Sequence, residues 1–219
     1  MDSLDEVTDR LRTLRDLVRF GASTFNALGL FFGHGTDNSG DEALALAACA
    51  LDLSPDQAIQ YLDARLTVTE IAAVYALFHQ RYETRKPAAY LTHEAWFAGR
   101  AYYVDGRVLV PRSPIAELIT TSFTPWFDAD TVHRVLDLCC GSGCIGIACA
   151  HVLPGATVDL VDCNAGALEV ARINVERHDM KERVRVVESD LYTQLTGRVY
   201  DLIVCNPPYV NADDYAALP

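Results

Sequence analysis

The chain has 219 residues, half of them apolar, and a formal net charge of −12. This composition allows one large or two small buried cores, whereas the acidic balance argues against non-specific nucleic-acid binding, which needs a basic surface. No apolar run approaches a membrane span, and the polar N-terminus lacks a signal-peptide pattern. Together with seven cysteines that show no secreted-scaffold spacing, these features predict a cytoplasmic protein without membrane contact.

Residues 1–86 are predicted to form a small all-helical domain. Its first segment has apolar residues at steps of three and four, which predicts one amphipathic helix through Leu4, Val7, Leu11, Leu14 and Val18.

Further helix signals follow along this domain. A second helix is expected over residues 41–53, and Ser54-Pro55 is a good start signal for a third. Thr67 and Glu70 form a capping box that opens a longer helix, which runs to about Arg85.

Residues 87–112 are predicted to form a β-hairpin linker, because strand-like residues 101–104 and 107–110 flank the turn signal Asp105-Gly106. The next helix is expected from Pro114 and carries Ile115 and Phe123.

Residues 113–219 show the alternation of buried strand and helix that is typical of an α/β domain with a parallel sheet. A strand over residues 133–138 runs into the glycine-rich segment CCGSGCIG, residues 139–146, and then into an apolar helix. Glycines let the backbone approach a ligand closely, and the helix N-terminus offers free N–H groups. The next two strands end at Asp162 and near Asp190.

The glycine pattern also fits a dinucleotide fingerprint, and NAD is therefore an alternative ligand. Asp137 argues against it, because a carboxylate just before the loop repels a pyrophosphate and attracts a cationic ligand. Asp162 is placed to accept from both ribose hydroxyls, and Asp190 from an adenine amine. A ribose diol, an adenine amine and a positively charged end together describe S-adenosylmethionine.

A fourth apolar strand, residues 200–205, leads into Asn206-Pro207-Pro208-Tyr209. Two prolines stiffen this turn at the carboxyl end of a strand, where open α/β sheets bind ligands. The prolines have no N–H, so the turn offers carbonyl acceptors together with the Asn206 side-chain oxygen, and Tyr209 adds a flat face. This combination suits a planar –NH2 group as the substrate.

The motifs at Asp137 to Gly143, Asp162, Asp190 and residues 206–209 resemble those of class I methyltransferases that modify planar nitrogens. Other stretches resemble the bacterial PrmB group, within the wider PrmB/HemK family of protein-glutamine N5-methyltransferases: GHGTDN at 33–38, DEA at 41–43, YLTHEAWFAG at 90–99, YVD at 103–105 and RVLVPRSP at 107–114. The resemblance covers roughly residues 10–219 and implies a large-subunit ribosomal protein as the substrate.

The resemblance also implies the fold and the site. It implies a class I, Rossmann-like methyltransferase sheet with strand order 3-2-1-4. The chain stops ten residues after Tyr209, so we expect a sheet that is incomplete at its C-terminus, with the fourth strand at its edge. The expected cofactor-binding residues are Asp137, Cys139, Cys140, Gly141, Ser142, Gly143, Asp162, Asp190, Leu191 and Asn206.

Asn206, Pro207 and Tyr209 are the expected catalytic residues, and with Pro208 they form the expected substrate site. No metal is expected, because Cys139-Cys140 lacks a paired second half. His34 and Arg112 receive no assigned role.

Three other functions remain open at this point: a release-factor glutamine methyltransferase, a nucleic-acid amino-methyltransferase, and a cofactor-binding fragment without turnover. The second uses the same turn but has to flip a base out of a duplex or act on a single strand, and the acidic charge disfavours it.

Overall fold

The structure is a computed structural model that describes residues 4–33 and 35–208. Contacts divide the chain into a helical unit, residues 1–94, and an α/β unit, residues 95–219. The helical unit contains six helices in its described residues: α1 (Leu4–Arg10), α2 (Leu14–Ala27), α3 (Ser39–Ala50), α4 (Pro55–Gln60), α5 (Val68–Thr84) and α6 (Ala88–Thr92). The expected division into a helical domain (1–86), a hairpin linker (87–112) and an α/β domain (113–219) stays a prediction.

Helices α2, α3 and α5 build the core of the helical unit. Leu17, Leu46 and Val74 are fully buried there, and the rings of Phe25 and Phe78 meet edge to face with centroids 5.4 Å apart. Burial of each such side chain stabilises the fold by roughly 1.5–3 kcal/mol. Tertiary packing of these faces therefore holds together helices that are too short to persist alone.

Local capping sets the helix boundaries in this unit. Ser54 and Thr67 cap α4 and α5 through reciprocal capping boxes, as the sequence predicts. Helix α3 begins earlier than expected, because the Asn38 side chain accepts from the Asp41 N–H at 2.9 Å.

The prediction of one helix through Leu4 and Val18 is wrong, because the chain breaks between α1 and α2. Thr13 and Asp16 form a capping box that starts a new helix, and the Arg12 guanidinium donates to the carbonyls of Thr8 and Asp9 at the end of α1. Apolar spacing continues across the break, so periodicity alone did not reveal it.

The α/β unit begins with a hairpin of β1 (Ala95–Phe97) and β2 (Arg100–Tyr102), followed by α7 (Ile115–Thr120) and a short 3₁₀ turn, Ala129–Thr131. Its sheet alternates strands with helices: β3 (Arg134–Leu138), α8 (Cys144–Val152), β4 (Thr157–Asp162), α9 (Ala165–Arg177), β5 (Val184–Glu188) and β6 (Leu202–Cys205).

The hairpin lies earlier in the chain than the sequence predicts. Its turn is Ala98-Gly99, with φ angles of 46° and 76°, so both central residues are left-handed as a tight two-residue turn requires. Asp105-Gly106 also turns the chain, but no strands pair across it: residues 101–102 belong to β2 and pair with β1, and the Asp105 side chain binds Arg107 and Tyr103 instead. The expected helix from Pro114 ends at Thr120, so Phe123 lies beyond it.

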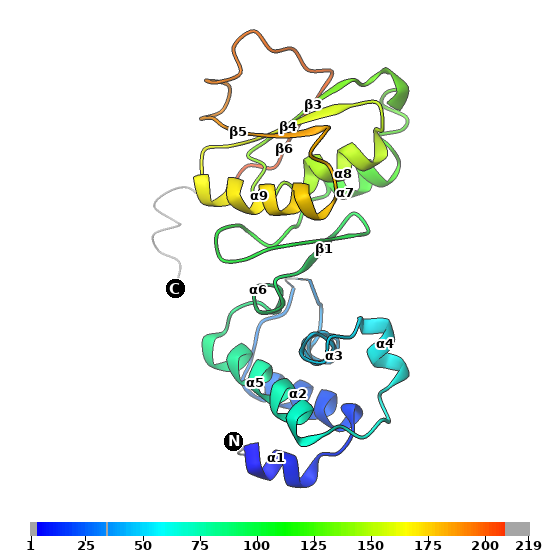
Figure 1. Ribbon diagram of the computed structural model, residues 1–219, viewed down its shortest axis with the longest axis vertical. Coiled ribbons are helices and arrows are strands. Elements are labelled where there is room, and N and C mark those ends of the chain that lie inside the picture. Colours follow the sequence, from blue (N-terminus) through cyan, green and yellow to red (C-terminus); the bar gives the residue numbers. More distant parts are fainter. Residues whose placement is uncertain (1–3, 34, 209–219) are drawn as a thin grey trace. The chain divides into compact units, whose positions relative to one another are not determined.

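All four strands of the main sheet are parallel, in the order β5-β4-β3-β6, so the expected order 3-2-1-4 is confirmed. Within the described residues β6 is an edge strand. Helices α7, α8 and α9 lie on one face of the sheet, where they share a core with Val135, Val158 and Leu160 (Figure 1). The loop after β5 lies on the other face, where Leu195 packs on Leu136. This architecture is an α/β fold with a parallel sheet, preceded by a helical region.

Among the described residues, no helix is long and apolar enough to cross a membrane.

Candidate active site

The glycine-rich loop connects β3 to α8 through a tight, left-handed path. Cys139, Gly141 and Gly143 have φ angles of 60°, 52° and 77°. A Cβ atom on Gly143 would lie 2.8 Å from a Leu160 methyl, and one on Gly146 would lie 2.3 Å from the same side chain. Glycine is therefore required for α8 to begin this close to the sheet.

Asp137 lies at the base of this loop and is completely buried. Its Oδ2 accepts from the Gly146 N–H at 2.7 Å, whereas its Oδ1 has no hydrogen-bond partner among the residues that the structure describes. Burial raises the pKa of this carboxyl to about 7, and the nearby Asp162 charge adds to the shift. A buried carboxylate with an unsatisfied oxygen costs stability unless a cationic or donor group is brought to it.

Asp162 lies at the end of β4 and holds the glycine loop. Its Oδ2 accepts from the Gly141 N–H and its Oδ1 from the Asn164 N–H, each at 2.9 Å. A carboxylate oxygen has a further lone pair, so these backbone contacts still allow it to accept from a ligand hydroxyl. Its expected role at the ribose stays a prediction.

Asp190 and Leu191 follow β5 and are exposed. Asp190 borders an open hollow of about 600 Å³. The hollow is also lined by Arg185, Val187, Glu188, Ser189, Thr193, Gln194 and Arg198. Because none of these residues belongs to the glycine loop, we define the candidate site by the strand ends and not by this hollow.

The turn at Asn206 follows β6, and the parallel register pairs Leu138 with Cys205. The residues that follow these two strands, Cys139 and Asn206, therefore leave the sheet side by side. The Asn206 side-chain nitrogen donates to the Arg112 carbonyl at 3.4 Å, which places the linker beside the turn. Pro207 and Pro208 are exposed. Tyr209 and His34 lie outside the described residues.

The strand order arranges the expected site residues in one row. The strands β5, β4, β3 and β6 are consecutive in the sheet and carry the expected site residues at their carboxyl ends. In the same order, these are Asp190, Asp162, the glycine loop and Asn206. The carboxyl ends of parallel strands lie on the same edge, where open α/β sheets bind ligands. The row extends from an acidic end at Asp190 to the proline-stiffened turn.

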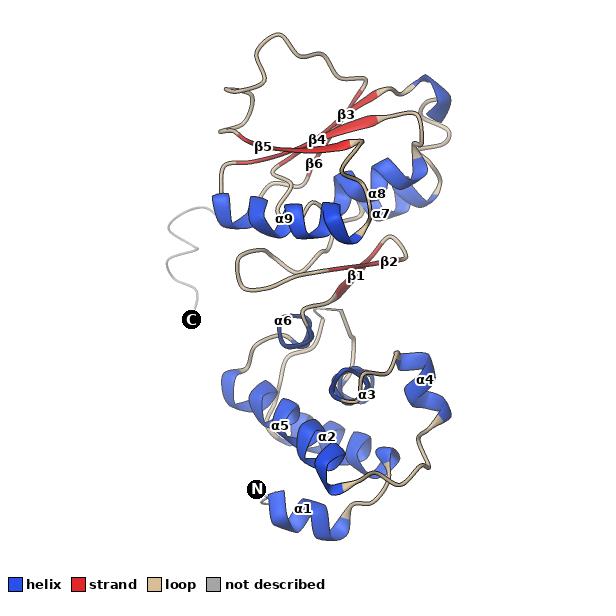
Figure 2. Ribbon diagram, in the orientation of Figure 1, coloured by secondary structure: helices blue, strands red, loops and turns tan. Residues whose placement is uncertain are grey.

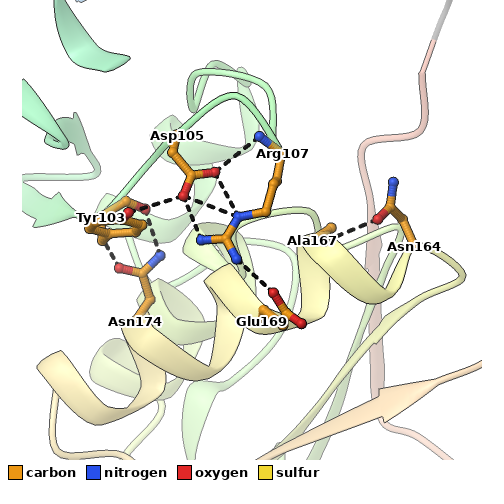
Figure 3. Close-up of polar contacts among 7 residues, drawn as sticks. All are labelled: Tyr103, Asp105, Arg107, Asn164, Ala167, Glu169 and Asn174. Atoms are coloured by element: carbon orange, nitrogen blue, oxygen red, sulfur yellow. Dashed lines mark hydrogen bonds and ion pairs between the residues drawn. The ribbon is translucent and has the colours of Figure 1, made fainter. Parts of the chain in front are cut away.

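Sequence reasoning missed Asn174, which is fully buried on α9 (Figure 3). Its side-chain amide binds both backbone groups of Tyr103 and the carbonyl of Ser142 in the glycine loop. The available signal was an amide between the apolar residues Ala171 and Val175 on one helix face.

The cysteines near the loop are packing residues. Burial raises the pKa of the Cys139 thiol to about 11 and that of Cys144 to about 12, so both stay protonated near neutral pH. In the part of the chain that the structure describes, no group of three or more acidic, histidine or cysteine side chains is arranged to hold a metal ion.

One solved methyltransferase structure overlaps this chain in part. The methyltransferase RsmC of T. thermophilus, solved with AdoMet and guanosine, is 23% identical and covers 54% of this chain, while this chain covers 33% of RsmC, with a TM-score of 0.43. This likeness adds nothing to the assignment.

Sequence relatives extend over nearly the whole chain. Residues 119–217 match the methyltransferase small domain family. The ribosomal protein uL3 glutamine methyltransferase of Neisseria gonorrhoeae is 49% identical over 98% of this chain and 72% of its own length. The protein of the same name from Xanthomonas campestris is 52% identical over 96% of this chain and 68% of its own length. The chain therefore belongs to the ribosomal protein uL3 glutamine methyltransferase family.

Proposed function

We propose that this protein transfers a methyl group from S-adenosylmethionine to the side-chain amide nitrogen of a glutamine in ribosomal protein uL3. The observation that carries the proposal is the row of strand ends, with a buried, half-satisfied Asp137 under a glycine loop at one point and Asn206-Pro207 beside it. The names of the relatives support the substrate. A cytoplasmic location, where ribosomes are made, is part of the proposal.

The residues of the row fit the cofactor by charge and hydrogen bonding. S-adenosylmethionine supplies, when bound, a methyl group activated by a positively charged sulfur. Asp137 provides a buried carboxyl oxygen under the loop that the described residues leave without a partner, and such an oxygen suits the cationic methionine part. We assign the backbone of Cys139, Cys140, Gly141, Ser142 and Gly143 to the methionine part, Asp162 to the ribose, and Asp190 with Leu191 to the adenine.

The proline-stiffened turn fits a planar amide. An amide nitrogen is a poor nucleophile, because its lone pair is delocalised into the carbonyl. We assign the Asn206 side-chain oxygen and the Pro207 carbonyl as acceptors for the two N–H groups of the substrate, while Pro208 stiffens the turn and Tyr209 stacks on the flat group. Such acceptors fix the orientation of the nitrogen and stabilise the positive charge that it gains on methylation.

The helical unit is proposed to recognise the substrate protein. The net charge of −12 suits a basic ribosomal protein and disfavours direct binding to nucleic acid.

The decisive experiment is a methyl-transfer assay with labelled S-adenosylmethionine. Purified uL3, ribosomes from cells that lack this modification, a peptide release factor and total RNA serve as parallel substrates. We expect label on one glutamine of uL3, located by mass spectrometry of its peptides. Label on the release factor or on RNA would overturn the substrate assignment, and binding of the methyl donor without any transfer would overturn the enzymatic one.

A further inference from the structure

The amide of Asn174 joins two segments that are far apart in the sequence, and Figure 3 shows its contacts with one of them, at Tyr103. Its Oδ1 accepts from the Tyr103 N–H at 2.7 Å, and its Nδ2 donates to the Tyr103 carbonyl at 2.9 Å. The same nitrogen donates to the carbonyl of Ser142, also at 2.9 Å. The side chain is fully buried, so removal of the amide would leave the carbonyl oxygens of Tyr103 and Ser142 without this hydrogen-bond donor.

One of the joined segments, residues 103–107, is an ordered loop (the 103–107 loop). The Tyr103 hydroxyl donates to Asp105 at 3.0 Å, and Asp105 also accepts from the backbone N–H and the guanidinium of Arg107. The guanidinium lowers the pKa of Asp105 well below its ordinary value. Arg107 also donates to Glu169 on α9 at 2.7 Å. Helix α9 therefore holds this loop at two points, Glu169 and Asn174.

The other joined segment is the centre of the glycine loop. Ser142 lies between Gly141 and Gly143 and is buried. On one side the loop is held by Asp162, through the Gly141 N–H, and on the other side by Asn174, through the Ser142 carbonyl. Both contacts orient peptide groups of the loop that we assign to the methyl donor.

We propose that Asn174 is a positioning residue that couples the 103–107 loop to the glycine loop, so that binding of the methyl donor orders both segments together. This inference rests on the proposed function, because it takes the glycine loop as the donor site. When the methyl donor fixes the Ser142 peptide, the Asn174 amide that binds this peptide is fixed as well. Through Asn174, the backbone of Tyr103 is fixed too. By thermodynamic reciprocity, loss of this link weakens donor binding by the same factor by which the donor stabilises the loop.

Two variants separate this coupling from general support of the fold. Asn174→Asp keeps the shape of the side chain and the oxygen that accepts from the Tyr103 N–H. It replaces the Nδ2 donor with an oxygen that repels the carbonyl oxygens of Tyr103 and Ser142. Glu169→Gln weakens the other attachment of the 103–107 loop and leaves Asn174 in place; its side chain is 62% exposed, so folding is preserved. We expect Asn174→Asp to bind S-adenosylmethionine about tenfold more weakly by calorimetry, and Glu169→Gln to bind it within about twofold of the wild type.

Hydrogen exchange gives a readout that a merely structural role would not change. In the wild type, the Tyr103 amide should exchange more slowly when the donor is added, and this protection should persist in Glu169→Gln and disappear in Asn174→Asp. Equal donor affinity in Asn174→Asp and wild type, or equal losses in both variants, would overturn the coupling.

The wild-type arm stands even if Asn174→Asp does not fold: donor binding that leaves Tyr103 exchange unchanged refutes the proposal. A wild type that fails to bind the donor overturns the proposed function, and the coupling with it.

Discussion

The helical unit and the α/β unit each bury a carboxylate, but they satisfy it differently. In the helical unit, Glu42 accepts from Arg81 at 2.7 Å and from Thr36 at 3.1 Å, and the two charged side chains are 2% and 3% exposed. Arg81 also donates to the Phe31 carbonyl. In the described part of the α/β unit, Asp137 has one backbone donor and an oxygen without a partner.

The difference separates a structural role from a functional one. The Glu42–Arg81 pair is satisfied within its own unit, and it binds the Phe31 carbonyl and the Thr36 hydroxyl to side chains on α5 and α3. Asp137 is left with a cost that a proton, or a bound cationic or donor group, removes. A buried charge that the protein completes itself stabilises its fold, whereas one that it leaves incomplete marks a ligand site.

The largest effect on stability is expected from Arg81→Met, which leaves the buried Glu42 charge without its partner. We expect a loss of about 3–5 kcal/mol in the unfolding free energy of the helical unit. Both tryptophans, Trp96 and Trp126, lie in the α/β unit, so helix loss should be followed by far-ultraviolet circular dichroism in urea.

The matched control is Arg15→Met, which removes an ion pair with Asp63 whose side chains are 59% and 81% exposed. It should change the stability far less than Arg81→Met does, because solvent screens an exposed ion pair. If both arginine variants lose the same stability, the buried pair is not the structural centre of this unit.

In the α/β unit, Asn206→Ala should remove catalytic activity while leaving the fold intact. We expect kcat for glutamine methylation to fall at least about a hundredfold, because an acceptor for the developing charge is lost. Donor affinity, measured on the same sample by calorimetry, should stay nearly unchanged. An active variant, or one that no longer binds the donor, would contradict the assigned role.

Asp162→Ala should weaken donor binding by one to two orders of magnitude, a loss of roughly 1.5–3 kcal/mol, since it removes a charged acceptor and the partner of the Gly141 N–H. Asp179→Asn removes an exposed charge just beyond α9 and serves as the control. Calorimetric titration with S-adenosylmethionine checks both. Unchanged affinity in Asp162→Ala would exclude this residue as a ligand of the ribose.

The smallest effect concerns local structure in the helical unit. Thr67→Ala removes the side chain that caps α5 and should cost about 1 kcal/mol of stability in urea unfolding. Ser113→Ala, in the α/β unit, removes only a 3.3 Å contact to the Ile115 N–H and should be near neutral. A larger cost for Ser113 than for Thr67 would show that capping is not what sets the helix boundaries.

The sequence predicted features that depend on neighbouring residues. The N-cap at Ser54 and the capping box at Thr67 depend on residues within three positions, and the strands of the main sheet are visible as apolar runs, so these were predicted where they occur. The row of strand ends followed from the strand order, which came from the family resemblance and is confirmed by the sheet.

Features that depend on distant contacts were not predictable. Asp105-Gly106 has the local chemistry of a hairpin turn, but Tyr103 and Arg107 are bound to α9, and the strands form elsewhere. Asn174 reaches residues that are 71 and 32 positions away in the chain. An unsatisfied oxygen such as Oδ1 of Asp137 is defined by packing on all sides, which a sequence motif does not specify.

We infer that the buried carboxylate of Asp137 destabilises the fold and contributes to binding of a cation. The variant Asp137→Asn tests both effects. Because the folded-state pKa is raised to about 7, the folded protein keeps a proton between about pH 4 and 7 that the unfolded chain has lost. The cost therefore grows as the pH rises through this window and is complete above pH 7.

The most direct measurement is paired urea unfolding and calorimetric titration of wild type and Asp137→Asn at pH 8, repeated towards pH 4. We expect a variant that is more stable than the wild type at pH 8, by on the order of 4 kcal/mol, with a difference that shrinks as the pH falls, and that binds S-adenosylmethionine at least about tenfold more weakly. A variant that is less stable than the wild type at pH 8, or that binds the methyl donor equally well, would contradict it.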